Sequence, residues 1–560
     1  MRFSNFGMRP LFRPLLYSLL AYALYVSGLG RVGFVGPDEP RYADVARGMM
    51  RLGDYITPYL YGAAWFEKPP LYYWLTAVTF RFGVNEMTAR LPSALAAAIF
   101  LGFWFWFARR FYGDCAAKFS CLMLATTLGW IGFGRAAAMD MLLATTLAAA
   151  LGLLALWLWE KRPPGLYGFY ALLAVATLAK GPLAIALAAL VILGYVIHRR
   201  EWKIVPRMLL SPAAALFAAI AIPWYLICYW RNGTPFIEEF FIKHNIERLV
   251  SAAAIGHAQP LWFYLPILPA ALFPWTPALL LPFWDAWKRG WRRVTESPER
   301  IFLIYWIALP FLFFSLSENK LPGYLLPILP PLTLWMGHAI SEHYGQESLG
   351  YWFTRATLAA SMVLLLSAPL IALLLPEALA SGLGEALAQA RLSGLVRQIL
   401  RGPVPMAGWI ALVGIVAFSL VLLWRGRTLD GAFAGALGVA WIVLLLTTYL
   451  SPAINRVASV RTVAQRLESY DVAPGQLAVF YLHRNQVYGL GFYMGALPVE
   501  WDPKKSSPGA HYVAARDDIA LDELHPGAHS LSLFPGQRLR LWTLAPRPPL
   551  ELAPASQPGK

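Results

Sequence analysis

The segment AAMDMLLATTLAAALGLLALWL, residues 137–158, has the composition of a helix that lies in a lipid bilayer. It is long enough for an α-helix to cross about 30 Å of hydrocarbon, and Asp140 is its only ionisable residue. Similar apolar windows recur up to about residue 450, and 58% of the 560 residues are hydrophobic while 14% are charged. One water-soluble domain uses less apolar material than this. We therefore predict a polytopic α-helical membrane protein with about thirteen transmembrane helices.

The charged residues predict how the chain is oriented across the membrane. The predicted spans are 11–30, 88–108, 116–134, 137–158, 165–179, 182–198, 208–230, 261–284, 301–316, 324–340, 353–375, 405–424 and 431–450. With a cytoplasmic N-terminus, the predicted inside loops carry clustered Lys and Arg, as the positive-inside rule requires. We therefore attribute the formal charge of +16 to basic residues that set the membrane orientation and contact anionic lipid. We expect no nucleic-acid partner.

The remaining polar segments fall on the far, periplasmic side in this topology. We divide the chain into a membrane domain, 1–450, with outer-face helices within 38–86 and an outer loop at 231–260, and a C-terminal region. Residues 453–470 have apolar residues at helical spacing, and short strand-like runs follow between Pro, Gly and Ser loops. We predict a small periplasmic α/β domain at 451–545 and a disordered tail at 546–560. A transporter would instead place ionisable groups near the midplane of several helices.

The first outer loop contains two charged clusters. In GPDEPRY, residues 36–42, Asp38 is placed to cap a helix, and the plainer alternative is that Asp38 only caps it while Glu39 only complements its dipole. In WFEKPPLYYW, residues 65–74, Glu67 and Lys68 stand between large aromatic residues. Lys68 is either an anchor that extends to the interface or a cation that holds a lipid phosphate.

These motifs, taken in order, resemble a known family. The acidic pair, the FEKPP sequence, Asp140 in AMDM, the KGP sequence at 180–182 and SENKLPGY at 317–324 are similar to the bacterial branch of the C-type glycosyltransferase superfamily, related to protein O-mannosyltransferases. Within it, the chain most resembles the lipid A aminoarabinose transferases. The resemblance also covers HNIER at 244–248 and PLWFY at 260–264.

The resemblance implies a C-type glycosyltransferase fold and roles for particular residues. It implies that Asp38 is catalytic or orients a substrate, and that Asp140 lies beside the first acidic loop. From the residues alone, Asp140 has the alternatives of pairing with Arg135 or capping its helix. A lipid phosphate that leaves as an anion needs fixed cations and donors, for which the candidates are Lys68, Arg248 and Tyr324. Arg41 and Tyr42 are weaker candidates for the lining of the same cavity.

A divalent metal such as zinc is a further candidate. Glu67, His244 and His257 are outer-face residues of metal-binding types, but they lack compact ligand spacing. They are candidate ligands of a structural ion, and we expect no cofactor to be required for catalysis.

The predicted function follows from the resemblance. We expect an inner-membrane enzyme that moves 4-amino-4-deoxy-L-arabinose from undecaprenyl phosphate to a lipid A phosphate at the periplasmic face, giving resistance to polymyxin and cationic peptides. The expected partners are the donor, the acceptor and membrane lipids, and we expect a monomer. The alternative is a related transferase with a hexose or uronic acid donor that acts on lipopolysaccharide or protein.

Overall fold

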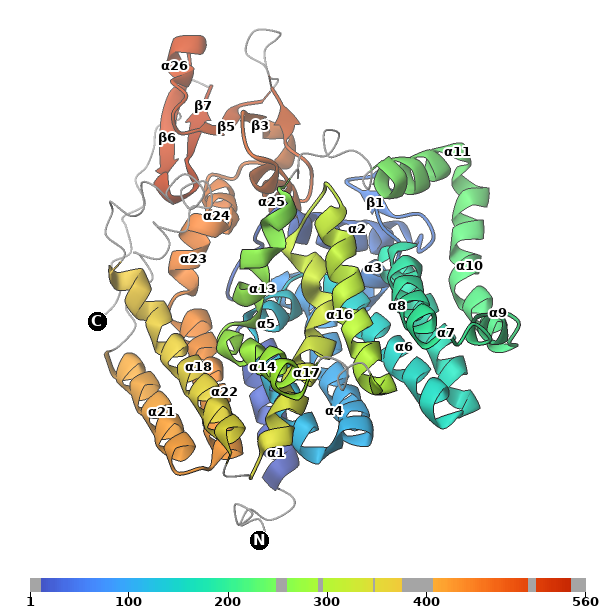
Figure 1. Cartoon of the computed structure of the whole chain (residues 1–560). Helices are drawn as coiled ribbons and strands as arrows, with labels where there is room; N and C mark the ends of the chain where they lie inside the picture. Colours follow the sequence, from blue (N-terminus) through green and yellow to red (C-terminus); the bar gives the residue numbers. More distant parts are fainter. Residues whose placement is uncertain are drawn as a thin grey trace.

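The computed structural model of the chain describes residues 12–247, 259–290, 296–345, 348–374, 406–501 and 510–544. A large bundle of helices fills most of the molecule, and a smaller unit that contains a β-sheet, coloured red in Figure 1, lies at one end of the bundle. The predicted tail at 546–560 lies outside the described residues.

Among the described residues, seven helices are long and apolar enough to cross a membrane, or eight if one bent pair counts as a span. They are α4 (Glu86–Thr126), α6 (Asp140–Glu160), α10 (Ala213–Asn232), α16 (Pro298–Leu316), α18 (Leu349–Leu374), α21 (Met406–Trp424) and α22 (Thr428–Thr448). The bent pair joins the helical segments Leu261–Leu272 and Thr276–Lys288 at 118°. The chain is thus a multi-pass membrane protein, and the count of thirteen spans is not confirmed.

Other predicted spans correspond to shorter helices. These are α1 (Phe12–Ala21) with its π-helical continuation η1 (Tyr22–Val26), α7 (Pro163–Lys180), α8 (Leu183–Arg199), and the 3-10 turn η6 (Pro322–Ile328) with α17 (Leu329–His343). Predicted span 261–284 is the bent pair, which contains α13 (Tyr264–Leu272) and α14 (Leu280–Arg289). Several prolines interrupt this segment, and each lacks the N–H that a straight helix needs.

Helix α4 contains two predicted spans because it folds back at Gly113. Gly113 has φ 88° and ψ 166°, which a residue with a Cβ rarely adopts. The Trp104 indole donates to the Ser120 hydroxyl at 3.0 Å, and the Cys121 thiol lies 3.7 Å from the Leu101 carbonyl oxygen. These contacts place the two halves side by side and antiparallel. Helix α5 (Leu128–Gly134) follows.

The antiparallel helices α6 and α7 bring two charged residues to one end of the bundle. A Cβ on Gly165 of α7 would lie 2.6 Å from the Leu153 carbonyl oxygen of α6, so glycine permits this close approach. Asp140 is the first residue of α6 and Lys180 is the last residue of α7. The antiparallel packing of the two helices therefore places Asp140 beside Lys180.

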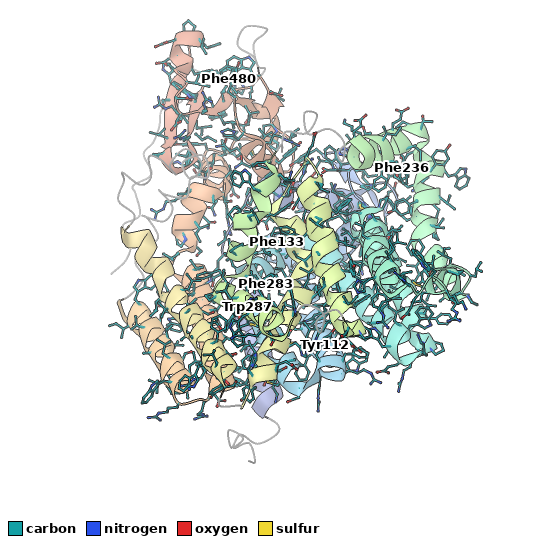
Figure 2. The ribbon with its side chains drawn as sticks, in the orientation of Figure 1. Tyr112, Phe133, Phe236, Phe283, Trp287 and Phe480 are labelled. Carbon is teal, nitrogen blue, oxygen red and sulfur yellow. The ribbon has the colours of Figure 1, made fainter. Side chains whose placement is uncertain are left out.

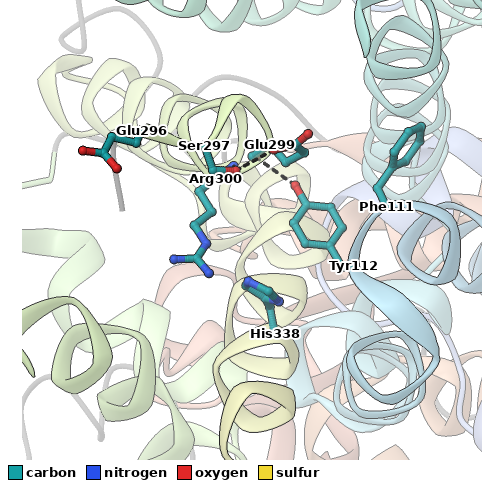
Figure 3. Close-up of a pocket in the computed structure, with 7 residues that line it drawn as sticks. All are labelled: Phe111, Tyr112, Glu296, Ser297, Glu299, Arg300 and His338. Carbon is teal, nitrogen blue, oxygen red and sulfur yellow. Dashed lines mark hydrogen bonds between the residues drawn. The ribbon is translucent and has the colours of Figure 1, made fainter. Parts of the chain in front are cut away.

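The opposite end of the bundle carries a different set of charges. Glu160, at the far end of α6, accepts from Arg110 at 2.5 Å and lies 3.1 Å from Arg162. Nearby, the Tyr112 hydroxyl donates to the Glu299 carbonyl oxygen at 2.8 Å, beside a cavity of about 480 Å³ that contains Arg300 and His338 (Figure 3). Figure 2 shows Tyr112 at this end and Phe236 and Phe480 toward the other. The basic loops that were predicted to be cytoplasmic thus lie away from Asp140.

The C-terminal region contains helices and one sheet. Helices α23 (Ser451–Ala458), α24 (Arg461–Ser469), α25 (Arg484–Met494) and α26 (Leu521–Leu524) accompany strands β3 (Leu477–Phe480), β4 (Val499–Glu500), β5 (Tyr512–Arg516), β6 (His529–Phe534) and β7 (Leu539–Thr543). The sheet order is β4-β3-β5-β7-β6. Strand β3 is parallel to β4 and β5, whereas β7 is antiparallel to β5 and β6. The periplasmic location of this C-terminal region stays a prediction.

Candidate functional site

The first outer loop forms a short helix, α2 (Asp38–Leu52), whose first turn carries the predicted charges. The side chain of Asp38 is 48% exposed, and it accepts a hydrogen bond from buried Arg41. Arg41 also pairs with Glu67, with 3.0 Å between Nη1 and Oε2. Asp38 does not cap the helix, because the N-cap is Pro37 and no side-chain cap is formed. The alternative of Asp38 as a simple cap is therefore wrong.

Glu39 has a structural role that differs from its prediction. Its buried carboxylate accepts from Arg90 Nε at 2.8 Å and Nη2 at 2.6 Å, and from the backbone N–H groups of Val35 at 2.8 Å and Ala137 at 2.7 Å. Arg90 in turn donates to carbonyl oxygens of the loop that precedes α2, including that of Gly33 at 2.9 Å. Glu39 thus joins α2, α4 and the segment before Asp140 and does more than complement a helix dipole.

Glu67 and Lys68 continue the charged cluster in the segment before helix α3 (Leu71–Thr79). Lys68 Nζ lies 3.6 Å from Glu67 Oε1, and both residues are buried. Phe66 holds the segment by an edge-on ring contact with Phe236, at 5.4 Å between centroids. An anchor that extends to a lipid surface would be exposed, so the burial of Lys68 favours a cation that serves an internal site.

A second cluster contains Asp140 and Tyr324. Lys180 Nζ donates to Asp140 Oδ1 and lies 4.8 Å from the ring centroid of Tyr324. Arg135 instead donates to the carbonyl oxygens of Leu24 and Ser27, so the alternative pairing of Asp140 with Arg135 is wrong. Asp140 also makes no cap. Lys180 was not among the predicted site residues, although the KGP sequence contained the signal.

Gly323 brings η6 against this second cluster. A Cβ at this position would lie 2.9 Å from Asp140 Oδ1 and 2.7 Å from Phe133, whose position Figure 2 labels. The backbone before Tyr324 is fixed by the Tyr264 hydroxyl, which donates to the Leu321 carbonyl oxygen at 3.1 Å. Helices α6, α7 and η6 therefore place Asp140, Lys180 and Tyr324 together.

A cluster of hydrophobic side chains connects the surroundings of the two charged clusters. One cluster of buried side chains contains Tyr42, Tyr73, Met139 and Ala179, which places the surroundings of Asp38 next to those of Asp140 and Lys180. Burial raises the pKa of Tyr42 well above its ordinary value, and the nearby Asp38 and Glu67 carboxylates raise it further. Tyr42 therefore keeps its proton at neutral pH.

Three buried donors around Arg41 have no hydrogen-bond acceptor among the described residues. They are Arg41 Nε, Trp65 Nε1 and the hydroxyl of Tyr73. Buried polar groups are hydrogen-bonded in the great majority of cases. A ligand rich in oxygen atoms would supply the missing acceptors, so this part of the structure suits a sugar or a phosphate.

The predicted metal ligands are not brought together in the described structure. His244 lies on a π-helical segment, η3 (Ile237–Glu247), whereas His257 and the predicted phosphate ligand Arg248 lie outside the described residues. In the part of the chain that the structure describes, no group of three or more His, Cys, Asp or Glu could hold a metal ion. The proposed set of Glu67, His244 and His257 thus stays a prediction.

Comparison with known proteins shows which fold and which relatives this chain resembles. The family model for dolichyl-phosphate-mannose-protein mannosyltransferase matches residues 67–227. The crystal structure of ArnT from Cupriavidus metallidurans bound to undecaprenyl phosphate has a TM-score of 0.74 and 22% identity, and the match covers 96% of this chain and 99% of that chain. The chain has the fold of ArnT. This match confirms the predicted helical membrane glycosyltransferase fold, but not the predicted number of spans.

Two curated relatives are more similar to this chain in sequence than the ArnT structure is. The undecaprenyl phosphate-α-4-amino-4-deoxy-L-arabinose arabinosyl transferase of Pseudomonas aeruginosa is 35% identical over 335 residues, which are 58% of this chain and 59% of that protein. The transferase of the same name from Yersinia pestis is 34% identical over 307 residues, 54% of each chain. The chain thus matches somewhat more than half the length of these relatives. The predicted resemblance is confirmed.

Proposed function

We propose that the chain is a glycosyltransferase that moves 4-amino-4-deoxy-L-arabinose from undecaprenyl phosphate to a phosphate of lipid A at the periplasmic face of the inner membrane. The observation that carries the proposal is the pairing of two acidic side chains with cations, one buried and one partly buried, at one end of the bundle. Asp38 pairs with Arg41, and Asp140 pairs with Lys180. The names of the matched relatives support the choice of sugar and carrier.

The chemistry requires the bond between the sugar's C1 and the carrier phosphate oxygen to break and a bond from C1 to an acceptor oxygen to form. The carrier phosphate leaves with the electron pair, so fixed cations that stabilise its charge lower the barrier. Lys68 and Lys180 are such cations, and each provides a point charge on a flexible stem. A lipid A phosphate is already an anionic nucleophile, so Asp38 need only orient the acceptor or the sugar amine.

We further propose that the reaction needs neither a metal nor a second chain. Lysine and arginine side chains supply the positive charge that a metal ion would otherwise provide. Both acidic clusters come from one chain, so a monomer is sufficient. The added sugar carries an amine, which lowers the net negative charge of lipid A and thus weakens its attraction for polymyxin and other cationic peptides.

The test is to express the chain in a strain that makes the aminoarabinose carrier but lacks its transferase, and to measure the mass of its lipid A. The expected result is added pentosamine. Added hexose or uronic acid would favour the alternative donor, and unmodified lipid A from a well-expressed protein would refute the proposal. Asp38→Asn should abolish the added mass. Asp114→Asn is the matched control, because Asp114 has a similar exposure of 50% but lies beside Arg109 at the other end of the bundle.

A further inference from the structure

Helix α25 of the C-terminal unit is fixed directly to the loop that carries Asp38. The Tyr61 hydroxyl donates to the Tyr488 carbonyl oxygen at 2.9 Å, and Arg47 Nη1 donates to the Phe492 carbonyl oxygen at 2.8 Å. A Cβ on Gly491 would lie 2.6 Å from the Tyr61 hydroxyl oxygen, so the helix and the loop are in close contact. The position of α25 relative to the candidate site is therefore well defined.

The ring of Tyr488 lies near two guanidinium groups. The Cζ atom of Arg41 is 5.5 Å from the ring centroid, and the Cζ atom of Arg484 is 5.8 Å from it. The two guanidinium carbons are thus no further apart than the sum of these distances. The ring of Tyr61, parallel to that of Tyr488 within 3°, supports it at 6.5 Å between centroids. Arg484 and Arg41 thus both lie beside the ring of Tyr488.

The two arginines differ in how their charges are balanced. Arg41 is buried and pairs with the carboxylates of Asp38 and Glu67. Arg484 is exposed, and no ion pair joins it to a carboxylate of the described residues. Because the charge of Arg41 is already balanced and that of Arg484 is not, Arg484 is the guanidinium group with charge left to bind an anion. A guanidinium group matches the oxygens of a phosphate in shape and charge.

We propose that Arg484, oriented by Tyr488, binds the phosphate group of the anionic acceptor. This inference rests on the proposed function and extends it, since it gives the C-terminal unit a role in acceptor recognition. The donor also has a phosphate, and Lys68 and Lys180 are the cations assigned to that group. The shared chemistry is a phosphate, and the kinetic measurements below distinguish the two sources.

The chain contains a matched control for this arrangement. On α24, the Cζ atom of Arg466 lies 4.9 Å from the ring centroid of Tyr470. The spacing of four residues is the same as between Arg484 and Tyr488, and Arg466 is also exposed. No contact joins the Arg466–Tyr470 pair to Arg41 among the described residues. Arg466→Gln therefore removes an equivalent charge from the same unit without changing the site.

The experiment compares the transfer kinetics of the purified full chain with Arg484→Gln and Arg466→Gln. For Arg484→Gln we expect the KM for lipid A to rise about three- to ten-fold, as for a partly exposed charge-assisted contact. The KM for the donor and the kcat should stay within about twofold of the wild-type values. Arg466→Gln should behave like the wild type. An unchanged acceptor KM in Arg484→Gln, an equal rise in both variants, or a rise in the donor KM alone would overturn the proposal.

A binding measurement separates this proposal from the proposed function. Lipid A and dephosphorylated lipid A in nanodiscs are the two probes, and their binding to each variant is measured without donor. Weaker binding of lipid A alone by Arg484→Gln supports the phosphate site even if the wild type transfers no sugar. Transfer by the wild type with equal binding by all variants would overturn the phosphate site and leave the proposed function standing.

Discussion

Two neighbouring acidic residues, Asp38 and Glu39, should respond in opposite ways to the loss of their charge. Glu39→Gln should destabilise the fold, because its carboxylate accepts two hydrogen bonds from Arg90 and two from backbone N–H groups. Asp38→Asn should leave the fold intact and abolish transfer, because Asp38 is 48% exposed and contacts Arg41 in the candidate site.

The expected magnitudes follow from burial. Removing one partner of a buried ion pair costs about 3–5 kcal/mol, because the other charge stays buried and uncompensated. Glu39 and Arg90 are both buried, with side-chain exposures of 8% and 5%. Glutamine keeps the shape of the side chain, but its NH2 group faces an N–H donor where an oxygen accepted before. We therefore expect about 3–5 kcal/mol for Glu39→Gln and less than about 1 kcal/mol for Asp38→Asn.

The assay is thermal unfolding of the purified protein in detergent, read by intrinsic fluorescence, together with the lipid A mass measurement. A large multi-part protein does not unfold in two states, so the shift of the midpoint and the yield of monodisperse protein are compared rather than a fitted free energy. Glu39→Gln should lower both. A Glu39→Gln protein as stable as the wild type, or an Asp38→Asn protein equally destabilised, would refute the assignment of separate roles.

Further predictions concern the second cluster and the donor. Lys180→Met should reduce transfer at least about ten-fold, since it removes the only cation that pairs with Asp140 among the described residues; wild-type rates would contradict the role. Gly323→Ala should reduce transfer because its Cβ would crowd the Asp140 carboxylate, while Gly132→Ala, which meets no atom within 4 Å, serves as the control in the same rate assay. Lys68→Met should lower kcat and raise the KM for the donor, each about ten-fold, with little change in the acceptor KM, as measured by steady-state kinetics. Treatment with EDTA should leave the rate of transfer unchanged, and its loss with recovery on adding zinc would show that a metal is required.

The sequence predicted where the site residues lie better than it predicted which of them form ion pairs. The predicted topology placed Asp38, Lys68, Asp140 and Tyr324 on one face, and in the structure each belongs to one of two charged clusters whose surroundings share a hydrophobic core. The gap between predicted spans 88–108 and 116–134 coincides with the fold-back of α4 at Gly113. Hydropathy windows measure composition rather than direction, however, so they treated the segment bent by 118° as one straight span.

Ion-pair partners could not be predicted because they depend on helix packing. A lysine in the last turn of a helix ordinarily complements the helix dipole. When α7 is considered alone, this effect already explains why a lysine occurs at position 180. Its partner Asp140 lies forty residues away, and the two meet because α6 and α7 pack antiparallel, so that the start of α6 lies beside the end of α7. The same reasoning applies to Glu39, whose partner Arg90 is fifty-one residues further along the chain.

The contribution of the C-terminal unit was the hardest feature to predict. The Tyr61 hydroxyl contacts the Tyr488 backbone across 427 residues of sequence, and no periodicity or spacing rule relates positions so far apart. A local reading of α25 finds an arginine and a tyrosine one helical turn apart, which is an ordinary surface pair and occurs again on α24. Its contacts with Arg41 and Tyr61 distinguish the α25 pair. Two pairs with the same local sequence pattern thus have different expected functions, and the difference comes from what the tertiary fold places beside each.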